Sequence, residues 1–217
     1  MGRLFLIDVG GAVALVGLWY FCFVRYNHRR GTKALRCLEA ACVGRGRVLE
    51  ARWLGTSGLQ AHLRFAAHWF ENARVTIRLL PRPLPVQWLF SAWHKQRETL
   101  TFEADLDCAP GMRLEVLRHR WVSHSDNKPV RESRDWTIVR PGPVVLTTSS
   151  QWKQEVPPIV TTLMTTRGHN LLSVRLRPES PHLAATIDLE ALSDEQSAAG
   201  FLGVLRDLAA GASTHRQ

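Results

Sequence analysis

One apolar segment near the start of the sequence constrains the fold more than any other feature. Residues Leu4 to Val24 read LFLIDVGGAVALVGLWYFCFV, and Asp8 is the only charged residue among them. As an α-helix at 1.5 Å per residue, the segment extends about 31 Å, enough to cross the hydrocarbon core of a bilayer. We therefore predict a single transmembrane helix. The predicted membrane-spanning residues are Leu4, Val9, Val13, Leu18, Trp19 and Val24.

The C-terminal end of this segment argues against two other interpretations. A cleaved signal peptide requires a small-x-small cleavage site after its apolar run, but this run ends in Phe-Cys-Phe-Val-Arg. A lipoprotein signal has a small residue before its cysteine, where this chain has Phe21 before Cys22. A buried core helix stays open as an alternative, although basic residues follow the run at once, without a cap or a turn.

Basic residues after the segment predict its orientation. Only Arg3 precedes the apolar run, whereas five basic residues follow it closely: Arg25, Arg29, Arg30, Lys33 and Arg36. The positive-inside rule then predicts a single-pass protein of the inner (cytoplasmic) membrane, with the N-terminus outside and the C-terminal domain in the cytoplasm. A basic residue near an anionic leaflet adds about 1 kcal/mol of attraction. The predicted lipid headgroup contacts are Arg25, Arg29, Arg30 and Lys33.

Small residues form a stripe on one side of the predicted spanning helix. Gly10, Ala14 and Gly17 follow one another at positions i, i+4 and i+7, which lie on one helix face. Small side chains let two spanning helices approach closely. This face is therefore the predicted contact for a homodimer or another protein partner, in addition to the bilayer itself.

Charge and length predict one folded domain behind the anchor. The chain has 217 residues and a formal net charge of +9, and residues 1–36 contribute +5 of that charge. The rest of the chain is only mildly basic, so nucleic acid is not a predicted partner. The predicted organisation is a transmembrane anchor (1–25), a basic juxtamembrane segment (26–36), an α+β cytoplasmic domain (32–211) that begins within it, and a flexible tail (212–217).

Hydrophobic periodicity after the anchor predicts an α+β fold. Residues 47–66 alternate on both sides of a Gly-Thr-Ser-Gly turn, which is typical of a β-hairpin. We expect a mainly antiparallel β-sheet with about four helices packed largely on one face. The expected helices are residues 32–43, 85–96, 151–166 and 193–211. The expected strands lie in 47–66, 73–82, 98–106, 112–122, 134–140, 143–149 and 171–190.

Local signals mark the ends of two of these helices. Thr32 is the expected cap of the first domain helix. Ser193 to Gln196 have the pattern of a capping box, and Gly211 has the pattern of a helix terminator. Residues 49–65 and 172–189 also resemble each other as amphipathic hairpins, and a duplicated helix-hairpin unit stays open as an explanation.

The sequence contains no recognisable motif for catalysis, cofactor binding or metal binding. Phosphate loops, nucleophile elbows, HExxH and EF-hand spacings are absent from it, and its four cysteines form no CxxC pair. Ser180, His182 and Asp188 have the residue types of a hydrolase triad, but nothing in the sequence brings them together. We interpret the acidic residues of 98–107 as a polar strand face paired with arginines at 113, 118 and 120. No catalytic, cofactor-binding or metal-binding residue is therefore predicted.

Tryptophans outside the anchor provide the remaining functional signal. Most are expected in the core and on the sheet. The candidates for an exposed apolar surface or groove are Trp69, Phe70, Trp88, Phe90 and Trp93. The predicted function is a non-enzymatic, membrane-anchored protein-interaction or scaffold module facing the cytoplasm. The alternative is a lipid or apolar-ligand binding domain held at the membrane surface.

Overall fold

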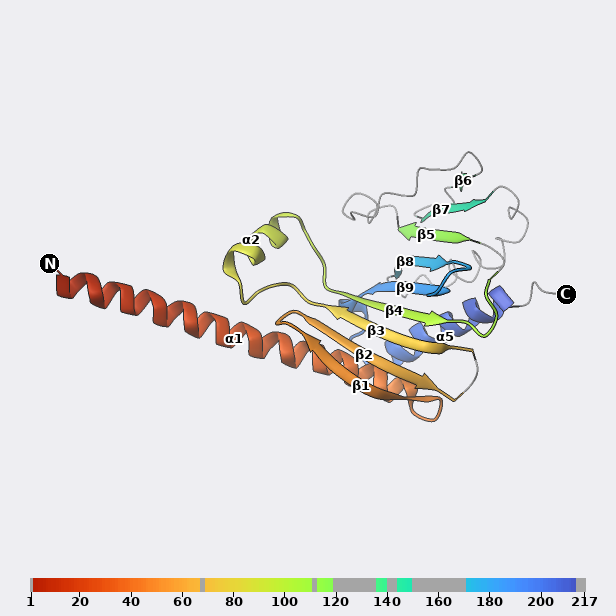
Figure 1. The fold of residues 1–217 in the computed structure, drawn as a ribbon, viewed down its shortest axis with the longest axis horizontal. Coiled ribbons are helices and arrows are strands. Elements are labelled where there is room, and N and C mark those ends of the chain that lie inside the picture. The colour runs from red at the N-terminus through yellow and green to blue at the C-terminus, as the bar shows by residue number, and fades with distance from the viewer. Residues whose placement is uncertain are drawn as a thin grey trace.

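The computed structural model describes residues 2–66, 69–110, 113–118, 136–139, 144–149 and 171–213. These ranges contain three α-helices, one 3-10 helix and nine strands (Figure 1). The helices are α1 (Gly2–Cys42), α2 (Pro85–Trp93), η2 (Leu189–Ala191) and α5 (Glu195–Ser213). The strands are β1 (Gly46–Leu54), β2 (Gly58–Phe65), β3 (Glu71–Arg78), β4 (Thr99–Asp105), β5 (Leu114–Arg118), β6 (Trp136–Val139), β7 (Val144–Ser149), β8 (Leu171–Leu176) and β9 (Leu183–Asp188).

The predicted α+β class and antiparallel sheet are confirmed. All nine described strands form one sheet in the order β1-β2-β3-β4-β9-β8-β5-β7-β6, and each neighbouring pair is antiparallel. The expectation of about four helices is not met within the described ranges, which hold three α-helices. The helix expected over 151–166 lies outside the described residues.

The first helix is longer than the sequence patterns suggest. We expected an anchor that ends near residue 25 and a separate helix over 32–43, whereas α1 is one continuous helix of 41 residues. Thr32 therefore lies inside the helix and caps nothing. Gly31, which usually weakens a helix interior, is needed here for close packing, because a Cβ at this position would lie 2.7 Å from the Trp53 ring. The Trp53 ring also stacks on His28, with ring centroids 4.0 Å apart.

The hydrophobic core lies between one face of the sheet and the two long helices. Strand alternation predicts this arrangement, and in β3 it buries Ala73, Val75 and Ile77. The C-terminal half of α1 contributes Leu38, and α5 contributes Phe201, both with no exposed area. Figure 1 shows α5 and this half of α1 lying along the same side of the sheet. The core therefore holds only the C-terminal half of α1.

The opposite face of the sheet is polar, as the alternation predicts. Strand pairing places Thr76, Thr101, Thr186 and Ser173 in one row across β3, β4, β9 and β8. The hydroxyl oxygens of Thr101 and Thr186 are 3.2 Å apart. Hydrogen-bonding side chains thus follow the row on the side away from the core.

Strand order corrects the predicted pairing of the acidic strand. We expected the carboxylates of β4 to face arginines of the next strand in sequence, but β4 lies between β3 and β9. Glu103 of β4 is instead opposite Arg74 of β3. Arg113 forms an ion pair with Glu179, at 3.1 Å. The error arises because the chain inserts the β8–β9 hairpin between β4 and β5, which sequence proximity does not indicate.

The start of α5 also differs from the predicted capping box. Asp194, rather than Ser193, caps the helix, since its Oδ1 accepts a 2.7 Å hydrogen bond from the backbone N–H of Ser197. This backbone hydrogen bond lowers the pKa of Asp194 below its ordinary value. The helix continues to Ser213, beyond the expected terminator Gly211.

Candidate membrane-facing site

The N-terminal half of α1 exposes most of its apolar side chains. From Ile7 to Phe21 the exposed large apolar side chains keep exposed fractions between 44% for Val9 and 70% for Leu15, and Trp19 alone among the large apolar side chains of this range is half-buried. Figure 1 shows this half of α1 extending away from the rest of the fold. Within the described ranges, α1 is the one helix that is long and apolar enough to cross a bilayer, and its apolar window is not buried. This stretch is therefore not packed as a core helix among the described residues.

The folded domain first contacts α1 at Trp19, close to the end of the apolar segment. The indole Nε1–H of Trp19 donates a 3.0 Å hydrogen bond to the backbone carbonyl of Arg82. The Trp19 ring lies 6.0 Å from the ring of Trp88 and 4.4 Å from that of Phe23. These contacts fix the loop before α2, and α2 itself, beside the end of the predicted span.

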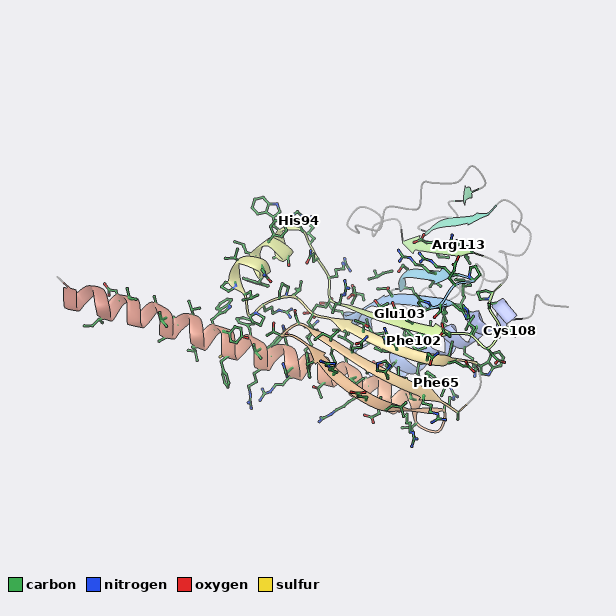
Figure 2. All side chains as sticks on the ribbon, viewed as in Figure 1. Phe65, His94, Phe102, Glu103, Cys108 and Arg113 are labelled. Atoms are coloured by element: carbon green, nitrogen blue, oxygen red, sulfur yellow. The ribbon has the colours of Figure 1, made fainter. Side chains whose placement is uncertain are left out.

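Helix α2 presents an apolar face that the described residues leave uncovered. Val86, Leu89, Phe90 and Trp93 occupy positions i, i+3, i+4 and i+7, which share one side of a helix. Their exposed fractions are 81%, 63%, 64% and 82%. A proline at the first helical position and a predicted helix over 85–96 agree with the observed start of α2 at Pro85. Figure 2 shows His94 at the outer end of this helix, away from the sheet.

A buried carboxylate connects α1 to the loops on either side of α2. The side chain of Glu98 is only 4% exposed. Its Oε2 lies 2.6 Å from Nε of Arg30, its Oε1 contacts Nη1 of Arg82, and the backbone N–H of Leu80 donates to Oε1 at 3.3 Å. Oε2 of Glu98 accepts no hydrogen bond, so its contact with Arg30 is an ion pair only. Burial lowers the pKa of Arg30, but a hydrogen bond to Tyr26 and the charge of Glu98 outweigh burial and raise the pKa.

Asn27 joins the same helix to two loops of the sheet. Asn27 lies in α1 and has no exposed area. The amide Nδ2 donates to the backbone carbonyl of Thr56, at 3.2 Å, and to that of Leu80, at 3.0 Å. Asn27 and Glu98 therefore form a polar junction where α1 leaves the domain. Nothing in the sequence signals this junction, because its members are distant in the chain and carry no motif.

The predicted headgroup-contacting residues lie on two sides of α1. Arg25, Arg29 and Lys33 are exposed, and they form no ion pair with any residue that the structure describes. Arg30 points instead to Glu98 and lies 3.7 Å from Glu190. Arg29, Arg30 and Lys33 line an open basin of about 580 Å³ together with Leu189, Glu190, Leu192 and Ser193. Three of the four predicted cations are thus free to meet an anionic surface.

The candidate residues for an apolar surface or groove lie in two separate places. Trp88, Phe90 and Trp93 belong to α2, whereas Trp69 and Phe70 lie between β2 and β3. The latter pair lines a pocket of about 290 Å³ between the C-terminal end of α1, the β2–β3 connection and α5. Sequence analysis missed Val86 and Leu89 as members of the α2 surface, although their helical spacing with Phe90 and Trp93 indicates it.

The second pocket contains a buried cysteine. Cys42 is 1% exposed and lines the pocket beside Trp69 and Phe70. Burial, with a smaller contribution from Glu39, raises the pKa of Cys42 to about 11. The group is therefore a neutral thiol at neutral pH, and the pocket is lined largely by apolar groups. All four cysteines of the chain are free.

The described residues do not assemble the Ser180, His182 and Asp188 combination. The hydroxyl of Ser180 donates to Oδ1 of Asp105 at 2.7 Å, and Asp188 forms an ion pair with Arg97 at 2.7 Å. Nδ1 of His182 lies near the backbone of residue 106. Among the described residues, no group of three or more His, Cys, Asp or Glu could hold a metal ion.

Comparisons with known proteins place no further constraint on this geometry. No protein-family model matches the sequence, and no curated protein is significantly similar to it. Function is therefore inferred from the contacts and exposed surfaces of the chain itself.

Proposed function

We propose that the chain is a single-pass inner-membrane protein whose α+β domain acts as a non-enzymatic interaction or scaffold module on the cytoplasmic side. The contrast between the two halves of α1 carries this proposal. The first half exposes large apolar side chains such as Leu15 and Phe21, while the second half buries Leu38 and Cys42 in the domain core. A continuous apolar surface of this kind requires a nonaqueous environment, which a bilayer supplies.

Charge supports the proposed orientation. The exposed cations Arg25, Arg29 and Lys33 lie on the domain side of the apolar segment, and Arg3 is the one basic residue on its other side. Moving this cluster through hydrocarbon is strongly unfavourable, since an arginine or lysine at the centre of a spanning helix costs about 2.5 to 3.5 kcal/mol. The domain is therefore expected on the cytoplasmic side.

The ion pairs of the domain support a non-enzymatic role. Several carboxylates in the described ranges are held by arginines: Glu98 by Arg30 and Arg82, Glu115 by Arg175, and Asp188 by Arg97. A carboxylate whose oxygens are held by an arginine is not free to reach the proton of a substrate. These groups serve the stability of the domain.

Fractionation of membranes with reporter fusions tests this proposal. The full chain is expected to stay in the membrane pellet after washing with carbonate at high pH. A C-terminal fusion is expected to give fluorescence with a cytoplasmic reporter and no activity with alkaline phosphatase. Val13→Arg combined with Val16→Arg should release the chain, whereas Val43→Arg, at an exposed position (75%) beyond the core half of α1, should not. A soluble wild-type chain, or an active phosphatase fusion, contradicts the proposal.

Self-association through the small-residue stripe stays a prediction. A Cβ added at Gly10 or Gly17 would meet no described atom within 4 Å. Trp19 comes two residues after Gly17, and two residues of an α-helix turn the side-chain direction by about 200°. Gly17 therefore faces almost opposite to Trp19. A second spanning helix at the stripe would therefore not compete with α2 for space.

A second candidate function is binding of an apolar ligand in the pocket beside Trp69. Its volume of about 290 Å³ is close to the lower limit of about 300 Å³ for ligand sites. Gly203 lines this pocket and has open space where a Cβ would lie. We expect Gly203→Leu to fill the pocket and to abolish binding of a fluorescent fatty acid. Trp93→Ala, on α2, should leave this binding unchanged. Equal binding of the fatty acid by the wild-type chain and both variants contradicts ligand binding there.

A further inference from the structure

The face of α2 that the described residues leave uncovered is the largest exposed apolar surface of a single helix outside α1 in those ranges. Val86, Leu89, Phe90 and Trp93 are each more than 60% exposed on one side of a nine-residue helix. Isolated exposed apolar residues are common on proteins, but four large side chains on a single helix face form a contiguous patch. Such a patch is typical of a surface that is covered in the working molecule.

The position of α2 along α1 indicates what covers this face. Trp88 on the inner side of α2 contacts Trp19, and the loop before α2 accepts the Trp19 indole hydrogen bond. Trp19 lies near the C-terminal end of the apolar segment, six residues before the cationic segment begins at Arg25. Tryptophan at such a position marks the boundary between headgroups and acyl chains. Figure 1 shows α2 standing apart from the sheet, on the side of the N-terminal half of α1.

We infer that α2 is a second membrane contact, an interfacial helix that lies at the boundary between headgroups and acyl chains beside the spanning half of α1. The inference rests on the proposed function, because it takes the apolar segment of α1 to be the transmembrane span. Interfacial helices bury an apolar face rich in Trp, Phe and Leu by about 5 to 10 Å and keep their polar face in water. The face formed by Val86, Leu89, Phe90 and Trp93 has this composition.

The surroundings of α2 favour lipid over a protein partner as the occupant. The exposed apolar surface of α2 lies beside that of α1, since Trp19 and Trp88 join the two helices. One bilayer therefore covers both surfaces without any further component. Lys95, exposed just after α2, places a cation where anionic headgroups lie. The exposed Arg25 of α1 adds a second cation near the same boundary.

Photo-crosslinking from single positions of the full chain tests this inference. Three variants carry p-benzoylphenylalanine in place of Leu15, Phe90 or Val43, all of which are exposed, so that folding is preserved. Each variant is reconstituted in vesicles of phosphatidylethanolamine and phosphatidylglycerol and irradiated, and phospholipid adducts are measured by mass spectrometry. Leu15 reports the span, Phe90 reports α2, and Val43 reports the end of α1 that lies away from the membrane.

Adducts at Leu15 and Phe90, with about tenfold fewer at Val43, are the expected result. Leu15 adducts without Phe90 adducts above the Val43 level overturn the inference and leave the anchor intact. Absence of adducts at Leu15 overturns the anchor and the inference together. The same variants in native membranes test the other occupant, because Phe90 adducts to protein in place of lipid would identify α2 as a protein-docking surface and overturn the inference.

A variant of α2 provides an independent measure. Leu89→Asp combined with Trp93→Asp should reduce lipid adducts from the probe at residue 90 by about tenfold, because two charged groups oppose insertion. Adducts from residue 15 should stay unchanged in the same variant. Unchanged adducts at residue 90 contradict the inference, since lipid contact there would not depend on the apolar face.

Discussion

At the scale of single residues, Glu98 connects more elements of the fold than its sequence context suggests. It is one acidic residue in a stretch of several, and alternation predicts an exposed strand face for them. In the fold its side chain is 4% exposed and holds Arg30 of α1 and Arg82 of the loop before α2. A buried charge of this kind is tolerated only with such partners. Glu98 therefore fixes α1 and the approach to α2 to the same point.

Removal of this carboxylate should destabilise the domain. We expect Glu98→Ala to lower the free energy of unfolding by about 2 to 4 kcal/mol, because two arginines would lose their counter-ion in a mostly buried site. The value is below that of a fully buried pair, since Arg30 keeps 30% of its side chain exposed. Denaturant unfolding of the full chain in detergent micelles measures the change.

The matched control is an exposed ion pair on the other side of the domain. Glu179 pairs with Arg113 but is 63% exposed, so Glu179→Ala should change stability by about 0.5 kcal/mol or less. Equal effects of the two substitutions would show that the Glu98 junction contributes nothing beyond a surface contact.

At the scale of elements, periodic patterns predict the individual helices and strands better than their joints. The β1–β2 hairpin, α2 and α5 lie where alternation or helical spacing predicts them. The continuity of α1 was missed, because Gly31 and Thr32 resemble a break when read locally. Packing of Gly31 against Trp53 outweighs the tendency of glycine to interrupt a helix. Trp53 is too distant in the sequence for a local pattern to show this contact.

An unbroken α1 has a measurable length. Nitroxide labels at residues 15 and 43 should lie about 42 Å apart, at 1.5 Å per residue, in a single narrow distance distribution. Arg25 is exposed on α1, and Arg25→Pro should kink or break the helix and broaden this distribution, whereas Arg25→Ala should preserve it. A broad distribution in the unmodified chain would indicate a hinge between anchor and domain.

At the scale of the whole molecule, the sequence indicates the long apolar segment and the fold class but not the apolar surface that α2 places beside that segment. Hydropathy locates the apolar segment, and alternation predicts the antiparallel sheet, because both are properties of neighbouring residues. The polar junction and the apolar face of α2 depend on contacts between distant segments. Trp19 with Trp88, and Arg30 with Glu98, are such pairs. The sequence contains the apolar spacing of α2 but not its position beside the apolar half of α1.

The unbroken helix has a mechanical consequence. If α1 crosses a bilayer as proposed, its continuity couples the apolar segment to the domain core, so a rotation of the anchor about the membrane normal also rotates the sheet. Two such helices packed side by side would hold their two domains at a fixed angle to each other about the membrane normal. A partner that binds the N-terminal half of α1 would then also set the orientation of the domain in the plane of the membrane.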